Sequence, residues 1–279
     1  MRTAGLVFSF NRPEYLAQVL QSLQKQTDKN IDYILIQDGA VNRISRRKYA
    51  NEHDVRQCVK MFTDADLPGS QTVVNSHNMG MAHQKLLGYS VAFKEYDYDT
   101  CIVFEDDLVV APNYVRLMRV LLHQFGSDRK IATVQASDSK VTYDDYNNLS
   151  YKELSLIEYS HRHFWGYGTW KDRWAMHKPI YDTYYNLIKD RDYRLRPHGK
   201  IRKLTGIKQT SHDAALDWCI EKCEQKKVNT VIPRATYIGR TGLHCRPDLF
   251  KKSGYEDRLS FPIDFEEDKD IDKFIFEGK

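Results

Sequence analysis

Three consecutive carboxylates, Glu105, Asp106 and Asp107, are the residues of this sequence whose types and spacing best suit chemistry. They directly follow residues 101–104, a short apolar run whose length predicts a buried strand. Adjacent carboxylates repel one another, so a cation close to them would stabilise the fold. Hard oxygen ligands of this kind suit Mg²⁺ or Mn²⁺, which in turn would hold a diphosphate. A solvated acidic turn is the simpler alternative, and these residues alone do not separate the two.

The segments around the acids alternate between strand and helix patterns. Apolar runs predict strands over residues 5–10, 31–36, 71–75, 101–104 and 130–135. Helical patterns begin at Pro13 and cover residues 48–62, 81–93 and 115–125. Such alternation predicts an α/β fold with a mostly parallel sheet and helices on both faces.

Polar residues follow the ends of several of these strands. Arg12, Asp38, Asn78 and residues 105–107 all come directly after a predicted strand. Ligands of parallel sheets bind beyond the carboxyl ends of the strands, so we expect these residues to meet in one site. Each of them alone would be interpreted as a turn or cap residue.

The bulk composition describes an ordinary α/β globule. The chain has 279 residues, a net charge of +4 and 29% charged residues, which fits one large domain or two small ones. No helix pattern carries a dense basic stripe with interleaved aromatics, which argues against nucleic acid. The five cysteines form no CxxC pair, so we expect reduced thiols. With no signal peptide and no membrane span in the sequence, we expect a cytoplasmic protein.

The second half of the chain offers weaker signals. In residues 163–174, Gly166 and Gly168 would allow a ligand close to the backbone, while Trp165 and Tyr167 offer faces for sugar stacking. A turn with rings packed inward is the alternative. Residues 191–209 are basic and lack an apolar period, which predicts a mobile loop serving as a lid.

In this order, the segments resemble the GT-A fold glycosyltransferases. They look closest to the inverting N-acetylglucosaminyltransferases that start complex N-glycans, and to related bacterial and viral nucleotide-sugar transferases. The resemblance runs from about residue 6 to residue 244 and implies a Rossmann-like sheet followed by an acceptor-binding half. We therefore expect a nucleotide-sugar subdomain over residues 1–137 and an acceptor and catalytic-base half over residues 138–279. The matching residues are Asn11-Arg12, Gln37-Asp38-Gly39, Glu105 to Pro112, the stretch 164–174 and Asp217-Trp218.

The resemblance implies a hexosyl or pentosyl transfer with inversion, from a UDP-sugar to a glycan or glycoconjugate acceptor. Mn²⁺ or Mg²⁺ would lie on Asp107, the last acid of a DXD-type motif. The other roles implied or expected concern the nucleotide sugar. Arg12 and Asp38 would contact the uridine or its ribose, His83 and His244 the diphosphate or nucleotide, and Glu105 and Asp106 would orient ribose and donor sugar.

The expected general base is Asp217. An attacking hydroxyl must lose its proton, and burial beside Trp218 would raise the pKa of Asp217 toward that task. Asp213 is the rival base, although its neighbour His212 equally makes it part of a helix cap.

Two other functions compete with glycosyl transfer. A sugar nucleotidyltransferase usually carries a glycine-rich loop after its first strand, whereas residues 9–13 contain no glycine. A catalytically inactive sugar-binding module would be expected to lose the metal-binding acids or the base, and the sequence keeps both.

Overall fold

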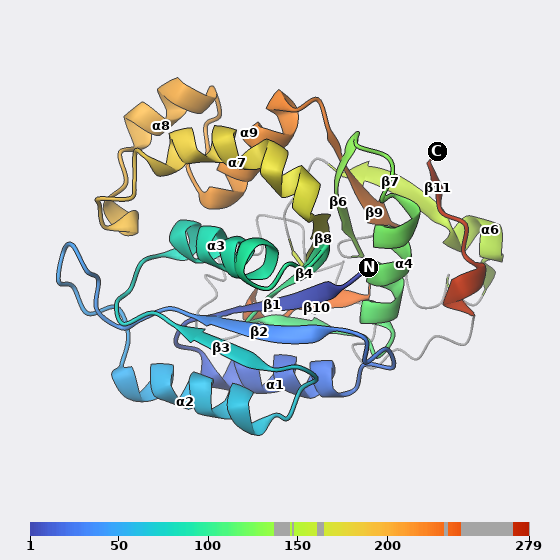
Figure 1. Cartoon of the computed structure of the whole chain (residues 1–279), viewed down its shortest axis with the longest axis horizontal. Helices are drawn as coiled ribbons and strands as arrows, with labels where there is room; N and C mark the ends of the chain where they lie inside the picture. The colour runs from blue at the N-terminus through green and yellow to red at the C-terminus, as the bar shows by residue number, and fades with distance from the viewer. Residues whose placement is uncertain (137–145, 147, 161–164, 232–233, 241–269, 279) are drawn as a thin grey trace.

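The protein has a layered α/β architecture around one large sheet (Figure 1). The computed structural model describes residues 1–136, 146, 148–160, 165–231, 234–240 and 270–278. The sheet has nine strands in the order β11-β7-β9-β6-β8-β4-β1-β2-β3. Its first four strands in sequence are mutually parallel, as predicted. They are β1 (Thr3–Ser9), β2 (Asp32–Gln37), β3 (Gln71–Val74) and β4 (Thr100–Glu105).

The second half of the chain extends the same sheet. Strand β8 (Tyr167–Trp170) lies between β4 and β6 (Ile131–Gln135) and is antiparallel to both. Next come β9 (Lys226–Thr230), parallel to β6, and then β7 (Leu156–Ser160) and β11 (Glu277–Gly278). One sheet thus joins residues 1–137 to the rest of the chain, and the division into two functional halves stays a prediction.

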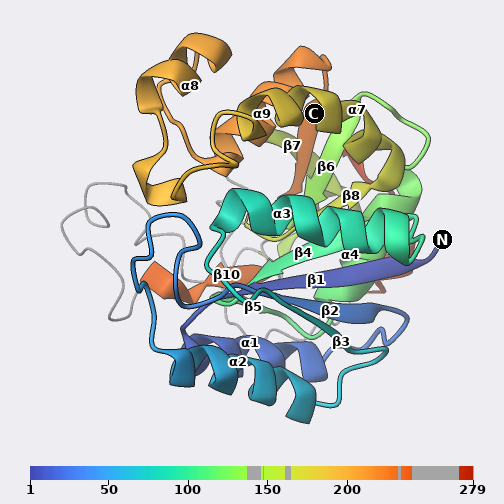
Figure 2. The same ribbon diagram turned by 60° about the vertical axis from the view of Figure 1, so that its left-hand side comes forward.

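Helices cover both faces because the strands bury side chains on both (Figures 1 and 2). In β1, Val7 packs into one core, while Leu6 and Phe8 pack into the other. The Val7 face is covered by α1 (Pro13–Gln24), α2 (Glu52–Asp64) and α4 (Tyr114–Gln124). The opposite face is covered by α3 (Met81–Ser90), α7 (Lys171–Tyr185) and α9 (His212–Lys222).

Local sequence sets where these helices begin. Pro13 occupies the first turn of α1, where its missing N–H costs no hydrogen bond. The side chain of Asn51 caps α2 by accepting from the backbone N–H of His53, which explains why this helix begins at Glu52 rather than at residue 48. The remaining elements are short. They are η1 (Val91–Glu95), β5 (Leu108–Val110), α6 (Tyr151–Leu154), η2 (Tyr193–Leu195), α8 (His198–Thr205), β10 (Ala235–Tyr237), η3 (Ile238–Arg240) and η5 (Ile271–Lys273).

The expectation of a loop over residues 191–209 is wrong, because this stretch contains η2 and α8. Only Ile201 of α8 is fully buried, so no apolar period was visible in the sequence. Helix α8 ends at Gly206, whose φ of 73° suits a left-handed cap. Within the described residues, no helix is long and apolar enough to cross a membrane.

Candidate active site

The acids lie in the turn between β4 and β5, at the carboxyl edge of the sheet. Asp107 is fully buried and Asp106 is 3% exposed. The second half of the chain covers this turn, since β10 pairs with β5 and the N–H of Ile238 donates to the main-chain oxygen of Asp107 at 2.8 Å. The turn is therefore covered by residues more than a hundred positions away in the sequence, and the meeting of Asp38 and Asn78 with the acids in one site stays a prediction.

Arg12 neutralises the two aspartates. Its Nη1 donates to Oδ2 of Asp107 at 2.5 Å, and its Nη2 pairs with Oδ1 of Asp106. The backbone N–H of Phe10 donates to the other oxygen of Asp106 at 3.2 Å. This bridge supplies the positive charge that adjacent carboxylates need. The contact of Arg12 with uridine stays a prediction, and it would require the guanidinium to leave at least one acid.

Asp107 has the properties of a carboxylate suited to a cation. Burial raises its pKa to about 7, and the nearby guanidinium of Arg12 only partly offsets this effect. The hydroxyl of Tyr237 bonds to the carboxyl group, yet Oδ1 has no hydrogen-bond partner among the described residues. A buried, unpartnered carboxylate oxygen is costly unless something positive binds it. A divalent metal ion fits this position.

Asp107 is not part of a larger ligand cluster, since no three His, Cys, Asp or Glu side chains form a metal-binding group in the described part of the chain. Mg²⁺ in particular is often bound by one or two carboxylates together with substrate phosphates and water. His244, predicted to face the diphosphate, lies outside the described residues.

Gly239 passes closer to the acid than any other residue type would allow. A Cβ at this position would lie 2.4 Å from Oδ2 of Asp107. Neither Gly239 nor Tyr237 stood out in the sequence, because nothing local marks a contact made across 130 residues of chain.

Glu105 is paired with a lysine that the sequence analysis missed. The ammonium of Lys85, on α3, lies 3.3 Å from Oε1 of Glu105. Lys85 is 3% exposed, and its Nζ lies 4.5 Å from the ring centre of Phe8 and 5.3 Å from that of Tyr167. The sequence did offer a signal for this contact, because Lys85 falls on the buried face of the predicted helix 81–93. The contacts of Glu105 and Asp106 with ribose and donor sugar stay predictions.

Asp38 holds the turn that precedes α3. Its Oδ1 accepts from Nε2 of Gln84 and from the backbone N–H groups of Gly39 and Met79 at 2.8–3.0 Å, while Oδ2 accepts from Asn78 and the N–H of Gly80. Burial nevertheless raises the pKa of Asp38 to about 6. The described residues already bond to both carboxylate oxygens of Asp38. A contact between Asp38 and uridine stays a prediction.

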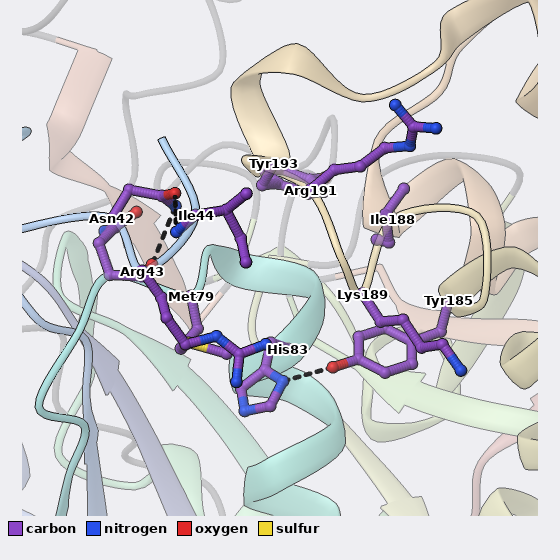
Figure 3. Close-up of a pocket in the computed structure, with 11 residues that line it drawn as sticks. Asn42, Arg43, Ile44, Met79, His83, Tyr185, Ile188, Lys189, Arg191 and Tyr193 are labelled. Carbon is purple, nitrogen blue, oxygen red and sulfur yellow. Dashed lines mark hydrogen bonds between the residues drawn. The ribbon is translucent and has the colours of Figure 1, made fainter. Parts of the chain in front are cut away.

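His83, in the first turn of α3, lines a small pocket of about 10 Å³ that Arg43 and Arg191 also line (Figure 3). Its Nδ1 lies 2.5 Å from the hydroxyl of Tyr185. Burial, followed by the charge of Arg43, lowers the pKa of His83, which favours the neutral ring. The pocket is basic, as a diphosphate contact would require, and the contact itself stays a prediction.

No family model matches the chain, and no curated protein matches it either. Among solved structures, GalNAc-T7 with UDP, GalNAc and Mn²⁺ is similar over 84% of this chain, with a TM-score of 0.54 and 10% identity. Residues 1–349 of S. aureus TarS are similar over 86%, with a TM-score of 0.53 and 9% identity. The chain has a GT-A-like glycosyltransferase fold. It spans 42% and 61% of the length of these two chains.

Within this GT-A-like fold, Asp217 of α9 is paired with a residue of β9. Its Oδ1 pairs with Nζ of Lys227 at 2.6 Å, and the side chain of Lys227 is buried. Lys227 comes three residues before the last residue of β9, hence roughly 10 Å from the carboxyl end of that strand. The role of Asp217 as the general base stays a prediction.

The rival base, Asp213, lies in the first turn of α9. Burial is the main cause of the high pKa of the Tyr89 hydroxyl, and the charges of Asp213 and Glu105 both raise it further. Tyr89 bonds to Tyr167 at the start of β8. His212 is the immediate partner of Asp213, with Nε2 at 2.9 Å from its carboxylate.

The aromatic–glycine stretch packs inward, which confirms the alternative to a sugar-stacking surface for Tyr167. Tyr167 is 1% exposed. Gly166 has a φ of 64°, and a Cβ there would lie 2.5 Å from the side chain of Leu108, so the close approach is to the core. Trp165 stacks on Tyr237, with ring centres 5.5 Å apart.

Proposed function

We propose that this protein is a metal-dependent glycosyltransferase that moves a hexosyl or pentosyl group from a UDP-sugar to a glycan or glycoconjugate acceptor, with inversion. The proposal rests chiefly on Asp107, which is buried with an unpartnered oxygen at the carboxyl edge of a GT-A-like sheet. The solved structure of GalNAc-T7 with UDP, GalNAc and Mn²⁺ supports a nucleotide sugar and a metal. The narrower resemblance to the N-acetylglucosaminyltransferases of complex N-glycans remains part of this proposal.

In this mechanism, Asp107 holds Mn²⁺ or Mg²⁺, which would neutralise the charge that develops on the leaving diphosphate. Arg12 releases one acid when that cation is present, and its guanidinium becomes available to the nucleotide. Glu105, held by Lys85, and Asp106 then orient the ribose and the donor sugar, while His83 approaches the diphosphate or nucleotide.

A carboxylate of α9 takes the proton from the acceptor hydroxyl. The spacing in the sequence favours Asp217, which pairs with Lys227 among the described residues. We assign the base role to Asp217, and Asp213, whose immediate partner is His212, is the alternative. An inverting transfer needs its base across the cleft from the leaving group, and α9 covers the opposite side of the acidic edge from α1.

The test is UDP binding by calorimetry, with and without Mn²⁺, in the wild type, in Asp107→Asn and in Asp64→Asn. Asp64 is an exposed acid at the end of α2 and serves as the matched control. Loss of an interaction with a charged group costs about 1.5–3 kcal/mol, so Asp107→Asn should weaken Mn²⁺-dependent binding roughly tenfold to hundredfold. Unchanged affinity in Asp107→Asn would refute the metal assignment.

Product analysis separates the competing functions. Release of a free or transferred sugar together with UDP supports a glycosyltransferase, and the anomeric configuration of the product reports inversion or retention. Formation of a nucleotide sugar from UTP and a sugar phosphate would instead identify a nucleotidyltransferase. Donor binding without any turnover would identify a binding module.

A further inference from the structure

Two separate stretches of the chain are strongly basic. Residues 43–48 and 189–208 together contain twelve lysines and arginines and two aspartates. Their net charge is therefore +10 in a chain whose total is +4, so the remaining residues sum to −6. We call these two stretches the basic surface.

The fold brings the two stretches together. Asp192 is 3% exposed and accepts hydrogen bonds from the hydroxyls of Ser45 at 2.5 Å and Tyr49 at 2.6 Å. The guanidinium of Arg194 lies 4.3 Å from the ring centre of Tyr49. The loop before α2 and the segment around η2 accordingly lie side by side (Figures 1 and 2). One of the two acids of the basic surface is thus used internally and is hidden from solvent.

Most cations of the basic surface are exposed to solvent. Eleven of the twelve are exposed, and within the described residues none lies at ion-pair distance from a carboxylate. Cations gathered in this way repel one another, which weakens the compact state. Such a surface is expected where an anionic partner provides the compensating charge. The exposed members are Arg43, Arg46, Arg47, Lys48, Lys189, Arg191, Arg194, Lys200, Arg202, Lys203 and Lys208.

Large apolar side chains are exposed within the same two stretches. Ile44 is 47% exposed, Leu195 54% and Leu204 38%. A dissolved polyanion would gain little from these aliphatic groups. An anionic lipid surface would use both features, because cations bind its headgroups while aliphatic side chains enter the boundary with the acyl chains.

We propose that the basic surface docks this protein onto a membrane rich in anionic lipids. It begins one residue after Asn42, which pairs with Asn78 at the carboxyl ends of the strands. Docking would therefore turn the acidic edge of the sheet toward the bilayer. The proposal does not depend on sugar transfer, and its test measures no turnover, so its failure is distinguishable from failure of the proposed function.

The experiment is co-sedimentation of the full chain with vesicles of phosphatidylglycerol and phosphatidylcholine, or of phosphatidylcholine alone. We expect binding only to the anionic vesicles, weakening as salt is raised. Each basic residue near such a surface contributes about a factor of five in affinity, so Arg43→Gln with Arg191→Gln should lose roughly 25-fold. Lys25→Gln with Lys29→Gln is the matched control, because both lysines are exposed after the far end of α1, and it should bind normally.

A second pair of variants tests the apolar part of the surface. Ile44→Ser should weaken vesicle binding about fivefold, since roughly half of an isoleucine side chain would lose its apolar contact. Ile275→Ser, at an isoleucine outside the basic surface that is 70% exposed, should have no effect. Three results would each overturn the proposal. The first is no binding to anionic vesicles at low salt, and the second is an equal loss of vesicle affinity in the double arginine variant and in the double lysine control. The third is normal binding of Ile44→Ser combined with full competition by soluble polyphosphate. The last result would identify a soluble polyanion as the partner.

Discussion

Gly239→Ala adds one methyl group directly against the acid proposed to bind metal. The new Cβ would lie 2.4 Å from Oδ2 of Asp107, whereas a carbon and an oxygen normally stay about 3.3 Å apart. The shortfall is roughly 0.9 Å, and Asp107 is buried and held by Arg12 and Tyr237. Either η3 or the carboxylate must therefore move by nearly 1 Å.

Gly239→Ala should lower both the stability of the fold and the transfer activity. Overpacking a buried site typically destabilises a protein by about 1–3 kcal/mol, which chemical unfolding would measure. A displacement of about 1 Å at a catalytic group commonly lowers activity about a hundredfold, which sugar-transfer rates with Mn²⁺ would measure. Calorimetry with UDP and Mn²⁺ should show weaker binding in the same variant.

Gly199→Ala is the control, because the space around Gly199 is open and the residue lies inside α8. Alanine there should raise stability by up to about 1 kcal/mol and leave UDP binding unchanged. If Gly239→Ala binds UDP and Mn²⁺ as the wild type does, η3 does not press on Asp107 and the proposed metal site is wrongly placed.

Three further predictions concern the other carboxylates and Lys85. Asp217→Asn should lower the transfer rate about 10²- to 10⁴-fold with near-normal donor binding, while Asp213→Asn should have a milder effect, and the reverse pattern in rates would move the base role to Asp213. Burial raises the pKa of Asp38 from 3.8 to about 6, so the folded state binds more protons and the wild type should lose about 3 kcal/mol of unfolding free energy as pH rises from about 4 to 6. Because the raised pKa of Asp107 acts in the same direction, urea unfolding across this range should show a loss about 3 kcal/mol smaller in Asp38→Asn than in the wild type, and identical pH profiles would contradict the assignment. Lys85→Met should destabilise the fold by leaving Glu105 without its cation, and adding Glu105→Gln should recover part of the loss in a double-mutant cycle.

Much of the fold followed from apolar runs, because strands buried on both faces are recognisable as short continuous hydrophobic segments. The predicted strands 31–36 and 101–104 fall within one or two residues of β2 and β4. Helix α8 escaped prediction because Ile201 is its sole fully buried residue, so tertiary packing rather than a sequence period defines it.

The candidate site was predictable only on the side formed by strand ends. The acids after β4 and the position of Arg12 after β1 follow from local sequence and from the geometry of parallel sheets. Tyr237 and Gly239 approach Asp107 only because β10 pairs with β5, a long-range register that no local pattern encodes. The choice between Asp213 and Asp217 depends on how far each carboxylate lies from the carboxyl edge of the sheet. Helical spacing in the sequence does not determine that distance.

The position of β8 limits how this protein can move. Strand β8 is hydrogen-bonded to β4 on one side and to β6 on the other. Rotation of the second half of the chain as a rigid lobe would therefore break strand pairing in the middle of the sheet. Hinge closure of two lobes, a common way to enclose a ligand, is therefore too costly here. If the protein transfers sugars as proposed, its ligands must enter and leave through rearrangement of the short elements along the carboxyl edge, while the sheet beneath them stays stationary.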